Sequence, residues 1–203
     1  MPNEPDPNSL PAAAGRKRTG PKKVTARYLE NAALYHLERY ATSRAHLGRL
    51  LTMRVERSAR AHGTDRNEGA EWIAAVLDKL TRNGLLDDRA YAETRARSLH
   101  RRGTSGRGIR ADLNAKGVAQ DLIGKALAGL VDDVTNPEAA AAIIYARKRR
   151  LGPYRAPEQR IEKRERDMSA LGRKGFSYDL VRQVIDAVDV TALEDILHHS
   201  RED

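Results

Sequence analysis

Two segments of this chain, residues 112–127 and 170–185, align with each other without a gap. They read DLNAKGVAQDLIGKAL and ALGRKGFSYDLVRQVI, and both place apolar residues at helical spacing around a Lys-Gly pair, at 116–117 and 174–175. A lysine stabilises the negative end of a helix dipole, and glycine takes the left-handed conformation that ends many helices. Each segment therefore predicts a helix that ends at Lys-Gly and a second helix directly after it. Such a recurrence is typical of a tandem array of small helical units.

A weaker copy of the pattern precedes these two segments, where Trp72, Ile73, Val76 and Leu77 line up with the last apolar positions of 112–127. The periodicity thus predicts an all-α fold of three tandem three-helix units. The proline-rich, basic N-terminal segment holds too few apolar residues to fold and is expected to be a disordered tail. The expected organisation is a tail at 1–24, units at 25–83, 84–131 and 137–188, and a C-terminal tail at 189–203.

The third unit contains two helices that the pattern outlines individually. One runs from about 158 to 174 and carries Ile161, Met168 and Leu171. The other starts at Ser177 and is expected to have Val188 at the end of its apolar face. The C-terminal tail is expected to hold at most one or two turns of helix from Val190.

Composition narrows the class of protein. Aromatic residues make up 4% of the chain and hydrophobic residues 40%, so the core must rest on Leu, Ile, Val and Ala, which suits thin helical layers. The net charge of +9 favours negatively charged partners, nucleic acid first, although arginines that only solvate helix faces would give the same balance. The absence of cysteine excludes disulfides and thiolate chemistry. No apolar run reaches the roughly 20 residues of a membrane span, so we expect a cytoplasmic protein without a membrane partner.

The acidic pair Asp87-Asp88 is interpreted as structural. Asp87 is a good helix N-cap, Asp88 complements the positive end of the helix dipole, and Leu86 pairs with Tyr91 as a hydrophobic staple. No pattern frames a nucleophile or a P-loop, and the six histidines lack metal-site spacing apart from one adjacent pair. We therefore expect no enzyme activity, no catalytic residue, no cofactor and no metal. The predicted structural caps are Asp87, Asp88, Gly117 and Gly175.

Basic residues gather in the middle of the chain and again after the third unit begins. They are candidates for a face that contacts DNA phosphates or an acidic protein surface, although each of them could also be a solvated residue. Aromatic residues are too few overall to predict a stacking platform for single strands. The candidate contact residues are Arg95, Arg97, Arg101, Arg102, Arg107, Arg110, Lys116, Arg147, Lys148, Arg149 and Arg150.

The stretch 84–118 carries an ordered combination of these features. It begins Gly-Leu-Leu-Asp-Asp-Arg-Ala-Tyr-Ala, continues through Arg95 and Arg97 to turn glycines at 103 and 108, and ends with Ile-x-x-x-Leu-x-x-Lys-Gly-Val. This combination resembles the signature of the RecX family, bacterial regulators of the recombinase RecA. The likeness is close over 84–127, and the three-unit layout extends it to about 28–188.

The chain departs from the family pattern at two places. Tyr91 stands where the family often has Phe, which is a mild change. The turn at 104–108 reads TSGRG where many members have a Gly-Pro step, which leaves the conformation of this turn open.

The resemblance implies an elongated, curved array that binds the RecA filament on single-stranded DNA and seats in its helical groove. It implies lower strand exchange, coprotease activity and ATP turnover by RecA, and no cofactor. We further expect a monomer that binds nucleic acid weakly. The alternative is a helix-turn-helix-like DNA-binding or transcription regulator, since small three-helix bundles often carry that motif.

Overall fold

The computed structural model describes residue 20 and residues 22–199, so most of the predicted N-terminal tail and residues 200–203 lie outside the described part. The described residues form ten α-helices and one short 3₁₀ turn, and they contain no β-strand. The elements are α1 (Ala26–Leu37), α2 (Arg44–His62), α3 (Arg66–Arg82), α4 (Asp88–His100), α5 (Gly106–Ala115), α6 (Gln120–Asp133), α7 (Pro137–Arg149), η1 (Gly152–Tyr154), α8 (Pro157–Gly172), α9 (Tyr178–Ile185) and α10 (Val190–His199).

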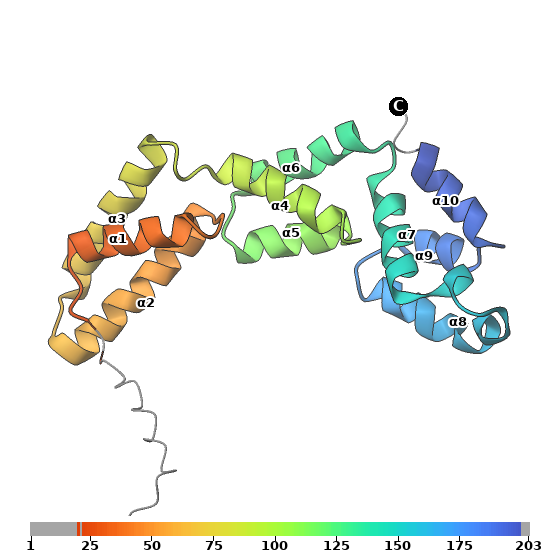
Figure 1. Ribbon diagram of the computed structural model, residues 1–203, viewed down its shortest axis with the longest axis horizontal. Coiled ribbons are helices and arrows are strands. Elements are labelled where there is room, and N and C mark those ends of the chain that lie inside the picture. Colours follow the sequence, from red (N-terminus) through yellow and green to blue (C-terminus); the bar gives the residue numbers. More distant parts are fainter. Residues whose placement is uncertain (1–19, 21, 200–203) are drawn as a thin grey trace, which may run out of the picture.

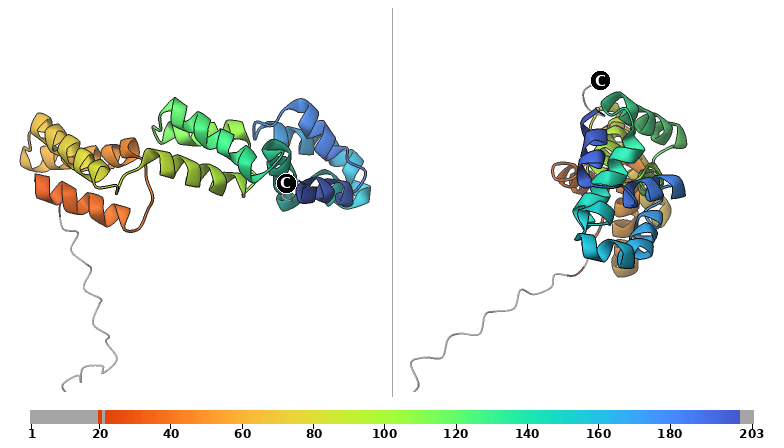
Figure 2. Two further views of the ribbon diagram at one scale, coloured as in Figure 1. Left: turned by 90° about the horizontal axis from the view of Figure 1, so that it is seen from above. Right: turned by 90° about the vertical axis from the view of Figure 1, so that its right-hand side faces the viewer.

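The helices follow one another along an arch in which each unit contacts mainly its sequence neighbour (Figure 1). From above, the same array is long and narrow (Figure 2). The first unit comprises α1–α3, the central unit α4–α6 and the third unit α7–α10. The buried apolar side chains form three separate clusters, within 24–86, 92–130 and 140–197. The expected all-α, elongated and curved array of three units is confirmed.

Short polar side chains set where most of these helices begin. Ser, Thr, Asp or Asn side chains accept backbone N–H groups of the first turn, which satisfies donors that a helix start otherwise leaves without partners. In the central unit, Asp87 accepts from the N–H groups of Arg89 and Ala90 at 2.9 and 3.0 Å. The residues that cap a helix in this way are Thr25, Ser43, Asp65, Asp87, Ser105, Asn136 and Ser177.

The third unit differs from its expected form in having a fourth helix. The segment from residue 189 was expected to be a tail, but α10 packs on α7, and Leu193 and Leu197 lie in the third core. Glu194 fixes the helix further, since it accepts the Tyr154 hydroxyl at 2.7 Å and pairs with Arg147 at 3.2 Å. Burial and this hydrogen bond raise the pKa of the Tyr154 hydroxyl.

Two apolar residues of the third unit lie outside its core. Met168 and Leu171 are buried as their spacing suggests, whereas Ile161 is 90% exposed and Val188 is 84% exposed. Helix α9 ends at Ile185, so Val188 has left the helical register that would have turned it inward. Ile161 lies in the first half of α8, whereas the residues that α8 buries lie in its second half.

Adjacent units are joined by a contact that occurs twice. The hydroxyl Oγ of Ser43, at the start of α2, donates to the carbonyl of Lys116 at the end of α5, at 2.5 Å. The hydroxyl of Ser105, at the start of α5, donates to the carbonyl of Lys174 at the end of α8, also at 2.5 Å. We call these contacts the first and second junction. Both serines are fully buried while they also cap their own helices, so one side chain serves the helix and the junction.

A carboxylate completes each junction in the same way. The backbone N–H of Arg44 donates to Asp88 at 2.7 Å, and that of Gly106 donates to Glu138 at 2.9 Å. In both cases the donor directly follows the junction serine, and the acceptor lies in the first turn of the next unit. Asp88 therefore bonds the preceding unit in addition to lying at the positive end of its own helix.

The glycine after each junction lysine allows the close approach. Gly117 has φ +76°, and a Cβ there would lie 2.6 Å from the Cβ of Ala45. Gly175 has φ +92°, and a Cβ there would lie 3.1 Å from the Ser105 hydroxyl. The Lys-Gly pairs thus end a helix and also make room for the unit before it.

Replacing Ser105 with alanine is expected to lower the free energy of unfolding by about 1–3 kcal/mol, because a helix cap is lost and the part-buried Lys174 carbonyl loses its donor. Urea unfolding followed by circular dichroism measures this loss. Ser177→Ala is the matched control, since that serine is exposed and caps only its own helix. Equal losses in the two variants would show that the junction hydrogen bond adds nothing.

Candidate functional site

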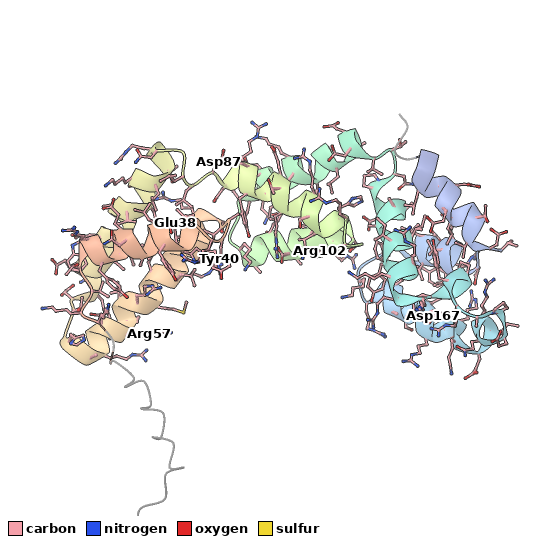
Figure 3. All side chains as sticks on the ribbon, viewed as in Figure 1. Glu38, Tyr40, Arg57, Asp87, Arg102 and Asp167 are labelled. Carbon is pink, nitrogen blue, oxygen red and sulfur yellow. The ribbon has the colours of Figure 1, made fainter. Side chains whose placement is uncertain are left out.

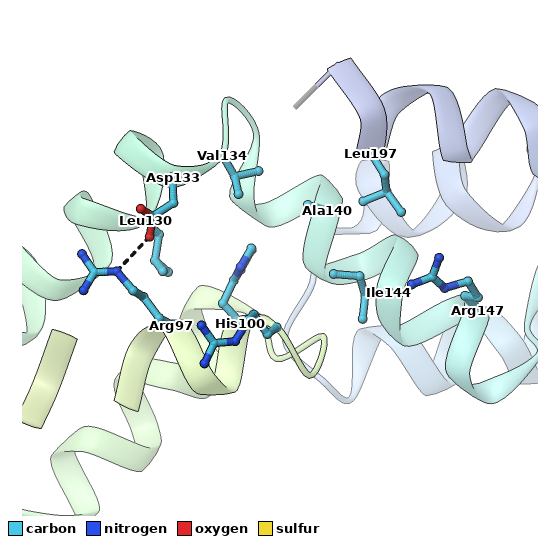
Figure 4. Close-up of a pocket in the computed structure, with 10 residues that line it drawn as sticks. Arg97, His100, Leu130, Asp133, Val134, Ala140, Ile144, Arg147 and Leu197 are labelled. Carbon is cyan, nitrogen blue, oxygen red and sulfur yellow. Dashed lines mark hydrogen bonds and ion pairs between the residues drawn. The ribbon is translucent and has the colours of Figure 1, made fainter. Parts of the chain in front are cut away.

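A cavity of about 490 Å³ lies between the central and the third unit (Figure 4). From here on, the second junction means this whole contact region between the two units, including the Ser105–Lys174 hydrogen bond. The floor of the cavity is apolar, and its rim is cationic. The floor includes Leu130, Val134, Ala140, Ile144 and Leu197. The rim carries Arg97 and Arg101 from α4, Asp133 from α6 and Arg147 from α7, with His100 between them.

The rim arginines differ in how free their guanidinium groups are. Arg97 pairs with Asp133 at 2.8 Å, with both side chains nearly half exposed, and Arg147 pairs with Glu194. The Arg101 side chain is exposed and makes no hydrogen bond or ion pair with any described residue. Exposed ion pairs contribute little and exchange readily, so the guanidinium groups of Arg97 and Arg101 are accessible to an anionic partner, while Arg147 lies on the rim with its half-exposed side chain held by Glu194.

His100 holds the rim in place through a part-buried hydrogen bond. It is 7% exposed, and its Nε2 lies 2.7 Å from the carbonyl of Pro137. A carbonyl only accepts, so Nε2 carries the proton and donates it. The histidine therefore ties the end of α4 to the start of α7.

A second cavity of about 530 Å³ adjoins the first and shares His100 and Leu130 with it. Arg107 and Arg110 of α5 line this second cavity, and both are exposed. The second junction thus gathers five of the predicted contact residues, which come from three helices and both units. They are Arg97, Arg101, Arg107, Arg110 and Arg147.

The other predicted contact residues lie elsewhere. Arg95 is engaged within the central unit, where it holds Asp112 of α5 through two hydrogen bonds of 2.9 and 3.0 Å. This bidentate bond lowers the pKa of the Asp112 carboxyl. Lys116 lies at the first junction, and Arg102 is exposed at the end of α4 (Figure 3).

The basic run that ends α7 points away from any described partner. Lys148, Arg149 and Arg150 are exposed, and Arg150 takes a left-handed conformation with φ +53° that ends the helix. Their charges favour the negative end of the helix dipole, which gives them a structural reason to be there.

Sequence reasoning did not single out His100, Asp133 or Glu138, all of which shape the second junction. One signal was available for Glu138, because it lies in the first turn of α7 as Asp88 lies in the first turn of α4. No group of three or more His, Asp or Glu side chains among the described residues could hold a metal ion. None of the described helices is long and apolar enough to cross a membrane.

A curved array of small helical units places this chain among α-helical repeat proteins. The family model for the second three-helix domain of RecX matches residues 87–127, which is the central unit. Regulatory protein RecX of Myxococcus xanthus is 46% identical over 176 residues, covering 85% of this chain and 93% of that protein. The chain belongs to the RecX family, whose members are regulatory proteins and not enzymes.

Further relatives agree with this assignment. Regulatory protein RecX of Thermobifida fusca is 37% identical over 160 residues, covering 74% of this chain and 83% of that protein. A crystal structure of regulatory protein RecX matches with a TM-score of 0.55 at 24% identity, over 80% of this chain and 72% of that one. RecX from Lactobacillus salivarius matches with a TM-score of 0.54 at 21% identity, over 79% and 94%. These two likenesses concern the fold alone.

Proposed function

We propose that this chain binds the RecA filament on single-stranded DNA and lowers RecA ATP turnover, strand exchange and coprotease activity. Membership of the RecX family supports RecA as the partner, and the direction of regulation follows from the family resemblance alone. The proposal includes a monomer in the cytoplasm that also binds nucleic acid weakly, as the net charge of +9 favours.

The second junction is the contact surface in this proposal. The observation that supports it most directly is the gathering of five guanidinium groups from two units around adjoining cavities. Arginine binds carboxylates and phosphates through paired hydrogen bonds, and an apolar floor between arginines suits a partner side chain. An acidic protein surface that carries an apolar anchor is therefore the partner chemistry that fits.

Reversing two of these charges tests the proposal. Arg101→Glu with Arg107→Glu changes two exposed groups whose side chains bond no other described residue, so the fold is expected to stay intact. Inhibition of RecA ATPase on single-stranded DNA is expected to need about tenfold more protein, because rim charges contribute to both association rate and affinity. Circular dichroism checks that helix content is unchanged.

Arg27→Glu with Arg82→Glu is the matched control, because both residues are exposed in the first unit and the charge change is the same. This control is expected to inhibit like the unaltered chain. Unchanged inhibition by the junction variant would place the contact elsewhere. If the unaltered chain left RecA ATPase unaffected but bound one duplex sequence far more tightly than others, the helix-turn-helix alternative would replace the proposal.

A further inference from the structure

A shallow groove of about 240 Å³ runs between α1 and α2 on the first unit, away from the second junction. Its walls combine apolar and cationic side chains. The apolar part includes Leu50 and Met53, and Met53 is 47% exposed. The cationic part consists of Arg54 and Arg57, with His36 opposite them.

The positive charge continues beyond the groove toward the first junction. Arg49 lies in α2 on the N-terminal side of Arg54. Its guanidinium donates to the carbonyl of Ala115 at 2.7 Å. That bond holds Arg49 near Lys116 of the central unit. Arg57, Arg54 and Arg49 therefore lie in this order along α2 toward the first junction, and Figure 3 labels Arg57 near the other end of the helix.

Among residues 22–199, no carboxylate forms an ion pair with Arg49, Arg54 or Arg57. The one acidic residue of α2, Glu56, is paired with Arg66 at 3.0 Å. Burial lowers the pKa of His36, and Arg54 lowers it further. Burial also lowers the pKa of His46, and the nearby basic side chains of Lys116, Arg49 and His36 lower it further.

Aromatic rings lie along the same side of the first unit. The rings of His36 and Tyr40 pack with their centroids 5.2 Å apart, and Tyr40 is 60% exposed. The Arg54 guanidinium lies 5.9 Å from the ring of Tyr28 and donates to its hydroxyl at 3.1 Å. The chain has few aromatic residues, yet the structure brings several together beside unpaired cations.

We propose that this surface, the α1–α2 groove with its flanking rings, binds single-stranded nucleic acid. Phosphates would lie on Arg54, Arg57 and Arg49, while unstacked bases would pack on Tyr40 and Met53. A cationic track beside exposed rings is how proteins hold single strands without reading sequence. A duplex offers its phosphates but keeps its bases stacked inside, so it would use the arginines alone. This site rests on the weak nucleic-acid binding included in the proposed function and gives it a surface of its own, which does not require RecA and is separate from the second junction.

Direct binding without RecA tests this inference. The full chain is titrated into a fluorescein-labelled oligothymidylate of about 20 nucleotides, with anisotropy read across a salt series. Arg54→Gln with Arg57→Gln is expected to weaken binding at least tenfold and to reduce the slope of log K against log salt by about 1.4, the value for two lost phosphate contacts on a single strand. Arg66→Gln with Arg89→Gln removes the same charge from two ion-paired residues and is expected to change affinity less than about twofold.

A ring variant separates stacking from charge. Tyr40→Leu is expected to weaken binding about tenfold while leaving the salt slope unchanged, because a stacking partner and no charge is lost. Photo-crosslinking of the unaltered chain to an oligonucleotide with 5-iododeoxyuridine is expected to label peptides of α1 and α2. The inference is overturned if a hairpin duplex binds as tightly as the single strand, if the arginine or the tyrosine variant binds like the unaltered chain, or if the crosslinks map to the second junction.

Discussion

Replacing Asp167 with alanine is expected to lower the free energy of unfolding of the third unit by about 3–5 kcal/mol. Asp167 is 1% exposed and accepts two hydrogen bonds from Arg155, at 2.7 and 3.1 Å. It also accepts the backbone N–H of Gly152 at 3.0 Å. Without the carboxylate, a partly exposed guanidinium and a buried N–H group both lose their partner. The loss is large because one fully buried side chain accepts three hydrogen bonds that join the segment before α8 to its core-facing half.

Urea unfolding followed by far-ultraviolet circular dichroism measures this effect, and the fluorescence of Trp72 reports the first unit separately, because the chain has one tryptophan. Asp186→Ala is the control, since Asp186 also holds an arginine, Arg164, at 2.7 Å but on the surface. Exposed pairs contribute at most about 1 kcal/mol, so the control is expected to change little. A loss below about 1 kcal/mol for Asp167→Ala would contradict the structural role of the buried pair.

Replacing Gly103 with alanine is expected to disrupt the second junction. Gly103 has φ +80°, which an alanine adopts only at a cost of about 1–2 kcal/mol. The new Cβ would also lie 2.7 Å from the backbone nitrogen of Tyr145 and 3.0 Å from the carbonyl oxygen of Ala141. These are backbone atoms of α7 and cannot move aside as a flexible side chain would. Overpacking adds about 1–3 kcal/mol, or the end of α4 separates from α7.

Gly84→Ala provides the matched control for this change. Gly84 has nearly the same conformation, with φ +70°, but a Cβ there would have no atom within 4 Å. The control therefore carries only the conformational cost. Small-angle X-ray scattering is expected to show a change in the longest dimension for Gly103→Ala and none for Gly84→Ala. Identical profiles for the two variants would mean that the contact with α7 does not set the angle between the units.

The sequence predicts the helical units because their signals are local. The periodic apolar residues, the serine and aspartate caps and the Lys-Gly ends all act within a turn or two of the chain. The junction contacts are different, since Ser43 and Lys116 lie 73 residues apart and Ser105 and Lys174 lie 69 residues apart. Nothing in the local pattern distinguishes a serine that caps one helix from a serine that also bonds the next unit.

The candidate site shows the same limit. The arginines of the central unit look alike in sequence, but Arg95 faces Asp112 across two helices and is engaged there, whereas Arg101 extends into solvent beside a cavity. Local pattern gives the charge of each residue and leaves open which charges are already paired. The cations of α2 were overlooked for a related reason, because they become a surface only when α1 brings its rings beside them. The contact residues of both surfaces remain predictions until the variants are measured.

The junction serine of the first two units has no counterpart at the start of α8. Each junction joins the start of the second helix of one unit to the end of the second helix of the next unit. Such a head-to-tail contact uses two different surfaces, and contacts of this type build open arrays unless the rotation closes them into a ring. The third unit lacks the donor, because α8 begins at Pro157 after Ala156, with no side-chain cap at all. A single alanine-proline step thus leaves the start of α8 without the hydroxyl that this head-to-tail contact uses in the first two units.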